Sequence, residues 1–465
     1  IYGGAEQNGH HFAWLFGHWQ LDGWEAIRRD LSPAEWAEYP TPGYPEPMAP
    51  GAILFGGTDP GRFVPTYLIF SAGIRPDLFL ITQNALADHH YLQHMRDLYG
   101  DRIWIPSAVE SQVAFQRYYD EVSEQDHGGA ALDAAGRLTV EGVGPVMRIN
   151  SHLSHMIFHA NPDREFYVEV SFPIEWMTPH LEPHGLIFRL RRERVTITDA
   201  MVAQDRAFWD WLTARLLADG RFRRDVMARK TFAGLRSAIA QVYAHHRRYT
   251  EAEYALRQAI ELYPLSLEGH FRLADLLVQQ GRFADAHEVT SHYISRDPLN
   301  ETAAEYAERV GEAVMAQQRV RMLESKMGQG PLTLEEAMEL TELYWRFQRL
   351  EEFRAALGSL IAQTGFPARA YLFMAKLAME AQEREALEVA LRRYLEADPT
   401  RTDVWMELAA AQLSRGAVAE ARDTLEAARR AGHGAAVRTA LAGDPRFAPL
   451  REAPQPLDSA PPKPE

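Results

Sequence analysis

The stretch from Gly51 to Asp88, GAILFGGTDPGRFVPTYLIFSAGIRPDLFLITQNALAD, decides how the first half of the chain folds. Apolar runs at 52–55 and 78–82 each end in a polar segment, and a helix-spaced apolar segment, 63–70, lies between them. This pattern predicts strand, helix and strand, which is the βαβ unit of a parallel sheet. We therefore expect residues 50–230 to form an α/β domain with a Rossmann-like sheet, parallel or mixed.

Polar side chains follow both predicted strands of this unit. Thr58, Asp59 and Arg62 follow the first strand, and Asn84 and Asp88 follow the second. Open α/β sheets bind ligands beyond the carboxyl ends of their strands, and a glycine-rich turn before a helix favours an anion such as phosphate. These five residues are therefore our candidate ligand site. A structural interpretation stays open, in which the glycines form the turn and Asp59 caps the helix, because no nucleotide-binding motif is matched.

Further strands are expected outside this unit, at 102–106, 164–172 and 185–192, with a turn at 181–184. Glu169 and Glu175 fall in this region as possible paired carboxylates. Their spacing is not diagnostic of acid–base chemistry, so we interpret them as strand-edge or capping residues.

His152, His155 and His159 stand at i, i+3 and i+7 of a predicted helix and so share one face. Such spacing can bring imidazoles to one metal ion. The same face carries the apolar stripe of the helix, so we interpret the histidines as structural, with a metal site as the alternative. We assign no metal, no cofactor and no catalytic residue.

Composition narrows the function classes. The 465 residues include no cysteine, which excludes disulfides, thiolate catalysis and cysteine zinc sites. The net charge of -15 argues against a nucleic-acid partner. No apolar window reaches the length of a membrane span. The chain opens with IYGGAEQNGHHF, without methionine or signal peptide, so we interpret it as a processed or excised piece of a longer protein.

The second half of the chain is repetitive. Small and apolar residues in EAEYALRQAIELYP, 251–264, recur 34 residues later and are closed by Pro264 and Pro298 in turn. A helical stretch, 301–333, interrupts the period, and three further units fit 334–367, 368–401 and 402–435. A 34-residue period of this kind is the tetratricopeptide signature. We expect five clear repeats and a degenerate sixth to stack into an α-solenoid, because one helix pair cannot bury its own apolar face.

These patterns divide the chain into four parts. Residues 1–49 form an aromatic lead-in that packs on the sheet domain, 50–230 the α/β domain, 231–450 the repeat solenoid, and 451–465 a disordered tail. The concave groove of such a solenoid, lined by the first helix of each pair, typically takes a peptide or another subunit. The expected partner is therefore a protein.

Several long motifs carry a resemblance to a known family. They are GHHFAWLFGHWQLDG, GGTDPGRFVPTYLIF, LITQNALAD, FYVEVSFPIEWMTPHLEPHGLIFRL, FWDWL and FAGLRSAIAQVYA. The sequence, over about residues 1–450, resembles the C-terminal half of a family of large bacterial polytopic membrane proteins whose multi-span region is similar to GT-C glycosyltransferases. Animal relatives of that family, which share the tetratricopeptide tail, are protein O-mannosyltransferases.

The resemblance implies an extracytoplasmic, membrane-associated chain, attached through an N-terminal membrane region that this sequence lacks. The family's presumed catalytic acids lie in that region, so none can be carried over to this chain. The first hypothesis is an acceptor-recognition module of a membrane glycosyltransferase-like protein, which binds a protein through the repeats and contacts a membrane portion of the same or a neighbouring protein. The alternatives are an independent α/β enzyme or binding domain for a phosphorylated or sugar ligand at Asp59 and Arg62, and a structural subunit of an extracytoplasmic assembly.

Overall fold

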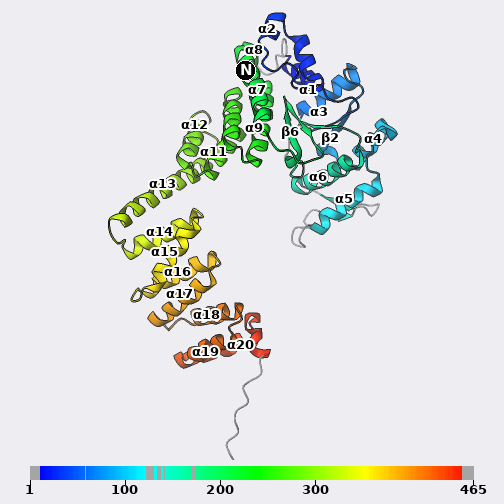
Figure 1. Ribbon diagram of the computed structural model, residues 1–465. Coiled ribbons are helices and arrows are strands. Elements are labelled where there is room, and N and C mark those ends of the chain that lie inside the picture. The colour runs from blue at the N-terminus through cyan, green and yellow to red at the C-terminus, as the bar shows by residue number, and fades with distance from the viewer. Residues whose placement is uncertain are drawn as a thin grey trace, which may run out of the picture. The chain divides into compact units, whose positions relative to one another are not determined.

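The computed structural model describes residues 11–57, 59–121, 130–132, 138–140, 142–169 and 174–452. Its first half holds a five-stranded sheet in the order β2-β1-β5-β7-β6 (Figure 1). The strands are β1 (Ile53–Gly56), β2 (Phe79–Thr82), β5 (Phe166–Val168), β6 (Leu181–His184) and β7 (Ile187–Leu190). A separate antiparallel pair, β3 (Ala130–Leu132) and β4 (Leu138–Val140), stands outside this sheet.

The sheet is mixed. β1 pairs in parallel with β2, Ile53 opposite Phe79, and in parallel with β5 on its other side, Ile53 opposite Phe166. β7 runs antiparallel to β5, and β6 antiparallel to β7. A helix, α3 (Asp59–Thr66), continued by the π-helical segment η1 (Tyr67–Ser71), connects β1 to β2. The predicted βαβ unit is therefore present, within a sheet that is only partly parallel.

Two strand predictions are wrong. No strand forms at 102–106, because the backbone N–H and C=O of Trp104 bond the side chain of Asn161, at 2.7 and 3.0 Å, and not a neighbouring strand. Residues 181–184 are the edge strand β6 and not a turn. The turn follows at Gly185, whose φ of 64° suits glycine, and the edge position tolerates Pro183.

Helices from the N-terminal and middle parts of the chain cover the sheet (Figure 1). They are α1 (Phe12–Asp30), α2 (Pro33–Ala37), α4 (His89–Tyr99), α5 (Ala108–Glu121), α6 (Val143–Ala160), α7 (Asp199–Ala218), α8 (Gly220–Arg224) and α9 (Val226–His245), with short 3-10 turns η2 (Gln83–Ala85), η3 (Gly100–Arg102) and η5 (Thr178–His180). The aromatic residues of α1, such as Phe16 and Trp19, are buried in the same hydrophobic core as the sheet. Helix α1 of the predicted lead-in therefore shares its core with the sheet.

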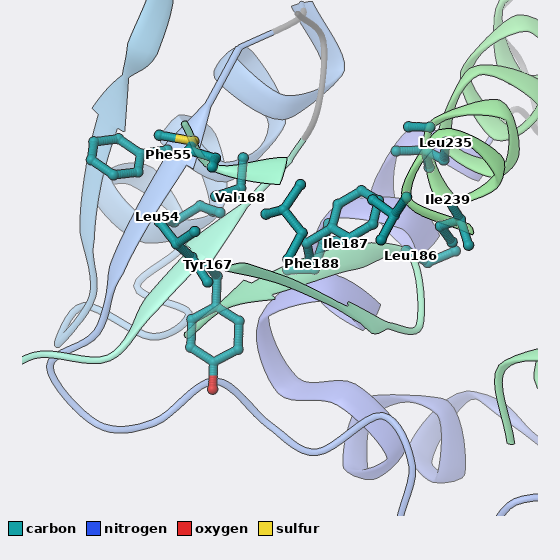
Figure 2. Packing of buried hydrophobic residues seen from close by; sticks show 14 of the residues in the cluster. Leu54, Phe55, Tyr167, Val168, Leu186, Ile187, Phe188, Leu235 and Ile239 are labelled. Atoms are coloured by element: carbon teal, nitrogen blue, oxygen red, sulfur yellow. The ribbon is translucent and has the colours of Figure 1, made fainter. Parts of the chain in front are cut away.

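The same core continues into the repeats. Figure 2 shows Leu186 and Ile187 beside Leu235 and Ile239 of α9, and all four belong to one buried cluster. That cluster extends through α10 (Tyr249–Leu262), α11 (Leu267–Gln279) and α12 (Phe283–Ile294) as far as Val310. The first helix pair of the repeats is therefore part of the sheet domain's own hydrophobic core.

The chain forms two compact units, residues 1–311 and 312–465, and the division falls inside the long helix α13 (Glu301–Gln329). The second unit contains α14 (Leu334–Arg346), α15 (Leu350–Ala362), α16 (Ala368–Glu380), α17 (Arg384–Ala397), α18 (Thr402–Ser414) and α19 (Val418–Ala428), then η6 (Arg429–His433), α20 (Gly434–Gly443), η7 (Pro445–Phe447) and α21 (Ala448–Glu452). The sequence boundary at residue 230 stays a prediction.

Five helix pairs share one turn. In each pair, the turn between the first and the second helix contains a residue at positive φ, between 56° and 84°. The next residue donates its backbone N–H to a carbonyl five positions earlier, at 2.8–2.9 Å. This is the Schellman closure of a helix. The positive-φ residues are Arg247, Gly281, Gln348, Gln382 and Gly416. The 34-residue spacing predicted from the sequence is therefore visible in the backbone.

α13 replaces one such pair with a single helix. The turn position, counted 34 residues after Gly281 or 33 before Gln348, falls on Met315, which lies inside α13. The surrounding Ala, Gln and Met residues favour helix, so the chain continues through this position as helix. The predicted interruption at 301–333 is therefore a repeat-length segment that does not turn. Among the described residues, no helix is long and apolar enough to cross a membrane.

Candidate functional site

The carboxyl end of β1 is the switch point of the sheet. β1 lies between two parallel neighbours, and the chain leaves β1 toward β2 on one side but leaves β5 toward β6 and β7 on the other. Ligands of open α/β sheets bind at this point, because the loops diverge and leave a crevice there. The glycine turn that begins at Gly57 follows β1 directly.

A buried carboxylate stands beside this turn. Glu169 follows β5 and is 2% exposed, and its Oε2 accepts the backbone N–H of Gly57 at 3.2 Å. Burial of a carboxylate is costly unless it is paired and hydrogen-bonded. The sequence interpretation treated Glu169 as a strand-edge residue, and it does lie at a strand end, next to the predicted site. Glu175, its suggested companion, is exposed.

Two amide side chains extend the polar cluster at the end of β2. Gln83 is buried, and its Oε1 has no hydrogen-bond partner among the described residues. The buried Oδ1 of Asn84 likewise has none there, whereas the backbone carbonyl of Asn84 accepts from Asn150 Nδ2 at 3.2 Å. A buried acceptor without a donor is uncommon, which makes these two oxygens candidate ligand contacts. Gln83 directly follows the strand and stands beside the predicted Asn84.

The remaining residues of the predicted ligand site are less informative. Asp88 caps α4, accepting the backbone N–H of His90 at 2.8 Å, and its side chain is exposed. Thr58 lies outside the described residues. Asp59 and Arg62 lie in α3, but their side chains are outside the described part of the structure. The structure therefore brings Asn84 to the switch point and gives Asp88 a capping role.

The three histidines lie on α6, as predicted, but only two of them meet. His155 and His159 are 3.0 Å apart through their Nε2 atoms, so one nitrogen carries the shared hydrogen. His152 Nε2 instead lies 3.1 Å from Glu121. Burial lowers the pKa of His155, with a further contribution from His159, and burial also lowers the pKa of His152 despite the neighbouring Glu121. In the described ranges, no three His, Asp or Glu residues form a group that could hold a metal ion.

The first helices of the repeats carry the other candidate surface. Met338 and Trp345 of α14 and Leu372 and Phe373 of α16 are half-buried, and they pack against the core of the second unit. The exposed Lys376 lies on α16 as well. Half-buried aromatic and methionine side chains are typical of protein interfaces, because they bury large apolar areas on contact.

Comparisons with known proteins agree with the repeats. Residues 243–308 match the tetratricopeptide repeat family model. A tetratricopeptide repeat protein from Parabacteroides merdae is 12% identical and covers 45% of this chain and 87% of its own, with a TM-score of 0.20. PilF of Pseudomonas aeruginosa is 15% identical and covers 45% and 98%, with a TM-score of 0.19.

YrrB, described as a TPR protein with an unusual peptide-binding site, is 10% identical and covers 46% of this chain and 90% of its own, with a TM-score of 0.18. TM-scores this low carry no argument about this chain. No curated protein matches the sequence. The matched repeat itself indicates a protein-interaction module.

Proposed function

We propose that this chain is the acceptor-recognition region of a membrane glycosyltransferase-like protein and that it binds a protein partner through its repeats. The observation that carries the proposal is the repeated helix pair, read in the sequence as a 34-residue period and matched at 243–308 by the tetratricopeptide model. The quoted motifs support the glycosyltransferase context by resemblance. Extracytoplasmic location and attachment to a membrane portion are parts of the same proposal.

The structural basis for binding is a surface that is already ordered. In the second unit the helix pairs contain the same turn and pack on one another, so the half-buried side chains of α14 and α16 are held in place before a partner arrives. Pre-organised side chains lose little conformational entropy on binding. A folded array therefore favours recognition of an extended peptide or a subunit.

Site-specific photo-crosslinking tests this proposal. A photoreactive residue at Leu372, half-buried on α16, is expected to give adducts with a discrete extracytoplasmic protein in cells. The control position is Val109, exposed on α5 of the first unit, which is expected to give none with that protein. Leu372→Glu should weaken binding of the identified partner by roughly tenfold or more, the usual scale for an interface anchor. Equal adducts from both positions, or none from Leu372, contradict partner binding through the repeats.

A second candidate function is favoured by the switch point. The buried Glu169 and the unpartnered oxygens of Gln83 and Asn84 converge on the end of the parallel strands, where a Rossmann-like sheet binds its ligand. These groups are hydrogen-bond acceptors, so they suit the hydroxyl groups of a sugar. Because Glu169 already accepts the Gly57 N–H, the phosphate in this alternative binds backbone N–H groups at the start of α3. The ligand in this alternative is a phosphorylated sugar.

Calorimetric titration distinguishes the two functions. In the alternative, the purified chain binds a sugar phosphate saturably, and Gln83→Leu, which removes one acceptor at similar volume, weakens binding by roughly tenfold. Gln93→Leu, on the exposed side of α4, is the matched control. Absence of saturable heat with sugar phosphates would exclude the alternative and leave the repeat proposal unchanged.

A further inference from the structure

Two pockets lie between neighbouring repeats, one in each compact unit. The first, about 980 Å³, is lined by α10, α11 and α12 and has an apolar floor that includes Ile260, Leu273 and Val289. The second, about 530 Å³, is lined by α17, α18 and α19 and has Leu395 and Leu408 in its floor. Both therefore have walls made by the second helices of consecutive pairs, a different side from the first-helix groove.

The two pockets are built from the same repeat positions. Nine of the ten residues that line the second pocket have a counterpart 135 residues earlier that lines the first. That distance is four repeats, one of them shortened by a residue at α13. The charged and apolar lining residues correspond pairwise as Arg257 and Arg392, Glu261 and Glu396, Leu273 and Leu408, Asp285 and Glu420, and Glu288 and Asp423. The chemistry of the lining is thus repeated along with the fold.

The intermediate repeat does not share this chemistry. At the four charged positions, α15 and α17 carry Gly358, Ala362, Ala386 and Val389. The fold alone therefore does not require charge there. The acidic residues belong to the second helices of particular pairs, α10 and α12 in the first pocket and α17 and α19 in the second.

Both pockets have an excess of negative charge. The first contains three carboxylates against Arg257 and Arg296, and the second contains three against Arg392. Several of these charges are already engaged. Arg257 bonds Glu253 at 2.7 Å, Asp285 bonds Arg282 at 2.7 Å, Glu396 bonds Arg393 at 2.8 Å, and Glu420 bonds Arg392 at 2.8 Å and Arg415 at 2.6 Å. Glu261, Glu288 and Asp423 have no ion pair among the described residues, so their carboxylates are available to a cation.

A buried histidine in the first pocket lacks a partner. His270 is 1% exposed, and its Nδ1 lies 2.7 Å from the backbone carbonyl of Ser266. A carbonyl only accepts, so Nδ1 carries the hydrogen and Nε2 is an acceptor. Nε2 has no hydrogen-bond partner among the described residues, although His270 lines the pocket. The missing partner is a donor, which an ammonium or guanidinium group supplies.

We propose that these two inter-repeat pockets each receive a lysine or arginine side chain from a basic, extended segment of the partner protein. The apolar floor packs against the aliphatic stem of that side chain, and the carboxylates at its mouth pair with the charged head. The inference rests on the proposed function, because it names the chemistry of the partner. It adds a second contact face to that of the first helices.

Peptide titration with a charge-matched control tests the pockets. The probe is a fluorescent 12-residue peptide with lysine at alternate positions, measured by anisotropy against the full chain. Two comparison peptides carry acetyl-lysine or glutamate in place of lysine. The lysine peptide should bind two sites per chain, and acetylation should weaken binding by about tenfold, because it removes the charge. The pocket variant, E261Q/E288Q/E396Q/D423N, removes two carboxylate charges from each pocket. The control variant, E301Q/E305Q/E342Q/E385Q, removes the same number of exposed carboxylate charges elsewhere in the chain.

The pocket variant should bind the lysine peptide about three- to thirtyfold more weakly, the range for losing two exposed ion pairs per site. The control variant should match the unchanged chain. E261Q/E288Q alone should weaken one of the two sites to the same extent and leave the other unchanged. Equal binding of the lysine and acetyl-lysine peptides, or equal loss in the pocket and control variants, overturns the inference. If the crosslinked partner still binds the pocket variant normally, the pockets are not part of the partner-binding surface and the proposed function stands. If lysine peptides bind but crosslinking finds no partner, the proposed function fails and the pockets remain lysine-binding sites.

Discussion

The first prediction concerns a buried ion pair that joins the sheet domain to the first repeat. Asp205 on α7 and Arg236 on α9 are both almost fully buried, and Arg236 Nη1 donates to Asp205 Oδ2 at 2.7 Å. Tyr243 donates its hydroxyl to the same oxygen at 2.7 Å, and Arg236 Nε donates to Gln258 on α10 at 2.8 Å. The ring of Trp209 lies 5.2 Å from the guanidinium. We expect Arg236→Met to destabilise the first unit severely.

The expected magnitude follows from what the substitution leaves behind. Methionine keeps most of the volume, so the packing loss is small, but Asp205 remains charged in the core with only Tyr243 as a donor. Breaking a buried pair in this way costs about 3–5 kcal/mol. The double variant Asp205→Leu, Arg236→Met removes both charges. It should cost only about 1–2 kcal/mol, chiefly for the lost partners of Tyr243 and Gln258.

Denaturant unfolding, followed by tryptophan fluorescence, measures both variants. Eight of the ten tryptophans lie in the first unit, so fluorescence reports mainly on that unit. The single and double variants form a double-mutant cycle together with Asp205→Leu, and the coupling energy should exceed about 2 kcal/mol. A cost below 1 kcal/mol for Arg236→Met, or additive single costs, would refute the view that α7, α9 and α10 share one buried electrostatic network.

Three further predictions concern the turns, an acid-sensitive strand and the long helix. Gly281→Ala should destabilise its repeat by about 1 kcal/mol, because φ is 72° there. Gln382→Gly, at φ 57°, should stabilise its repeat by up to about 1 kcal/mol. Thermal unfolding of the two variants checks that the two changes have opposite signs. Burial lowers the pKa of His184 to about 4, and its Nε2 donates to the Glu46 carbonyl at 2.8 Å. Because the unfolded state takes up this proton near pH 6.5, acidification from pH 6.5 to 4 should remove about 3 kcal/mol of stability, and His184→Gln should remove that part of the pH dependence of urea unfolding. Met315→Gly should cost α13 about 1 kcal/mol of helix stability and speed amide hydrogen exchange around that residue, and unchanged exchange would contradict the role given to its helix-forming neighbours.

Local patterns predicted the elements whose causes are local. The apolar run at 52–55 and the spacing of the repeats depend on near neighbours, so the βαβ unit and the helix pairs follow from sequence. Residues 102–106 do not form a strand because the Asn161 side-chain amide, 57 residues away in sequence, hydrogen-bonds both backbone groups of Trp104. A backbone partner so distant in sequence leaves no periodic signal. The same holds for β6, which became a strand because β7 lies beside it.

The sequence predicted where the candidate site lies more completely than it predicted which residues form it. Strand ends are local features, so the polar residues that follow apolar runs, Asn84 among them, could be placed at the ends of the strands from sequence. Glu169 reaches the same point from a strand 112 residues after Gly57, and its burial depends on the order of strands in the sheet. Gln83 stands next to Asn84 at the end of the same apolar run, so its place at the strand end is visible in the sequence. Its significance comes from an unpartnered oxygen, which only coordinates reveal.

The straight helix α13 limits where the inter-repeat pockets can form. Each pocket needs three consecutive helices, second, first and second, because its lining residues come from all three. α13 joins a first and a second helix without a turn, so the three-helix arrangement is interrupted on both sides of Met315. The two acidic pockets lie in helix sets that exclude α13, one ending at α12 and the other beginning at α17. Both pockets should therefore keep their lysine-peptide affinity in Met315→Gly, and a loss there would show that their geometry depends on the long helix.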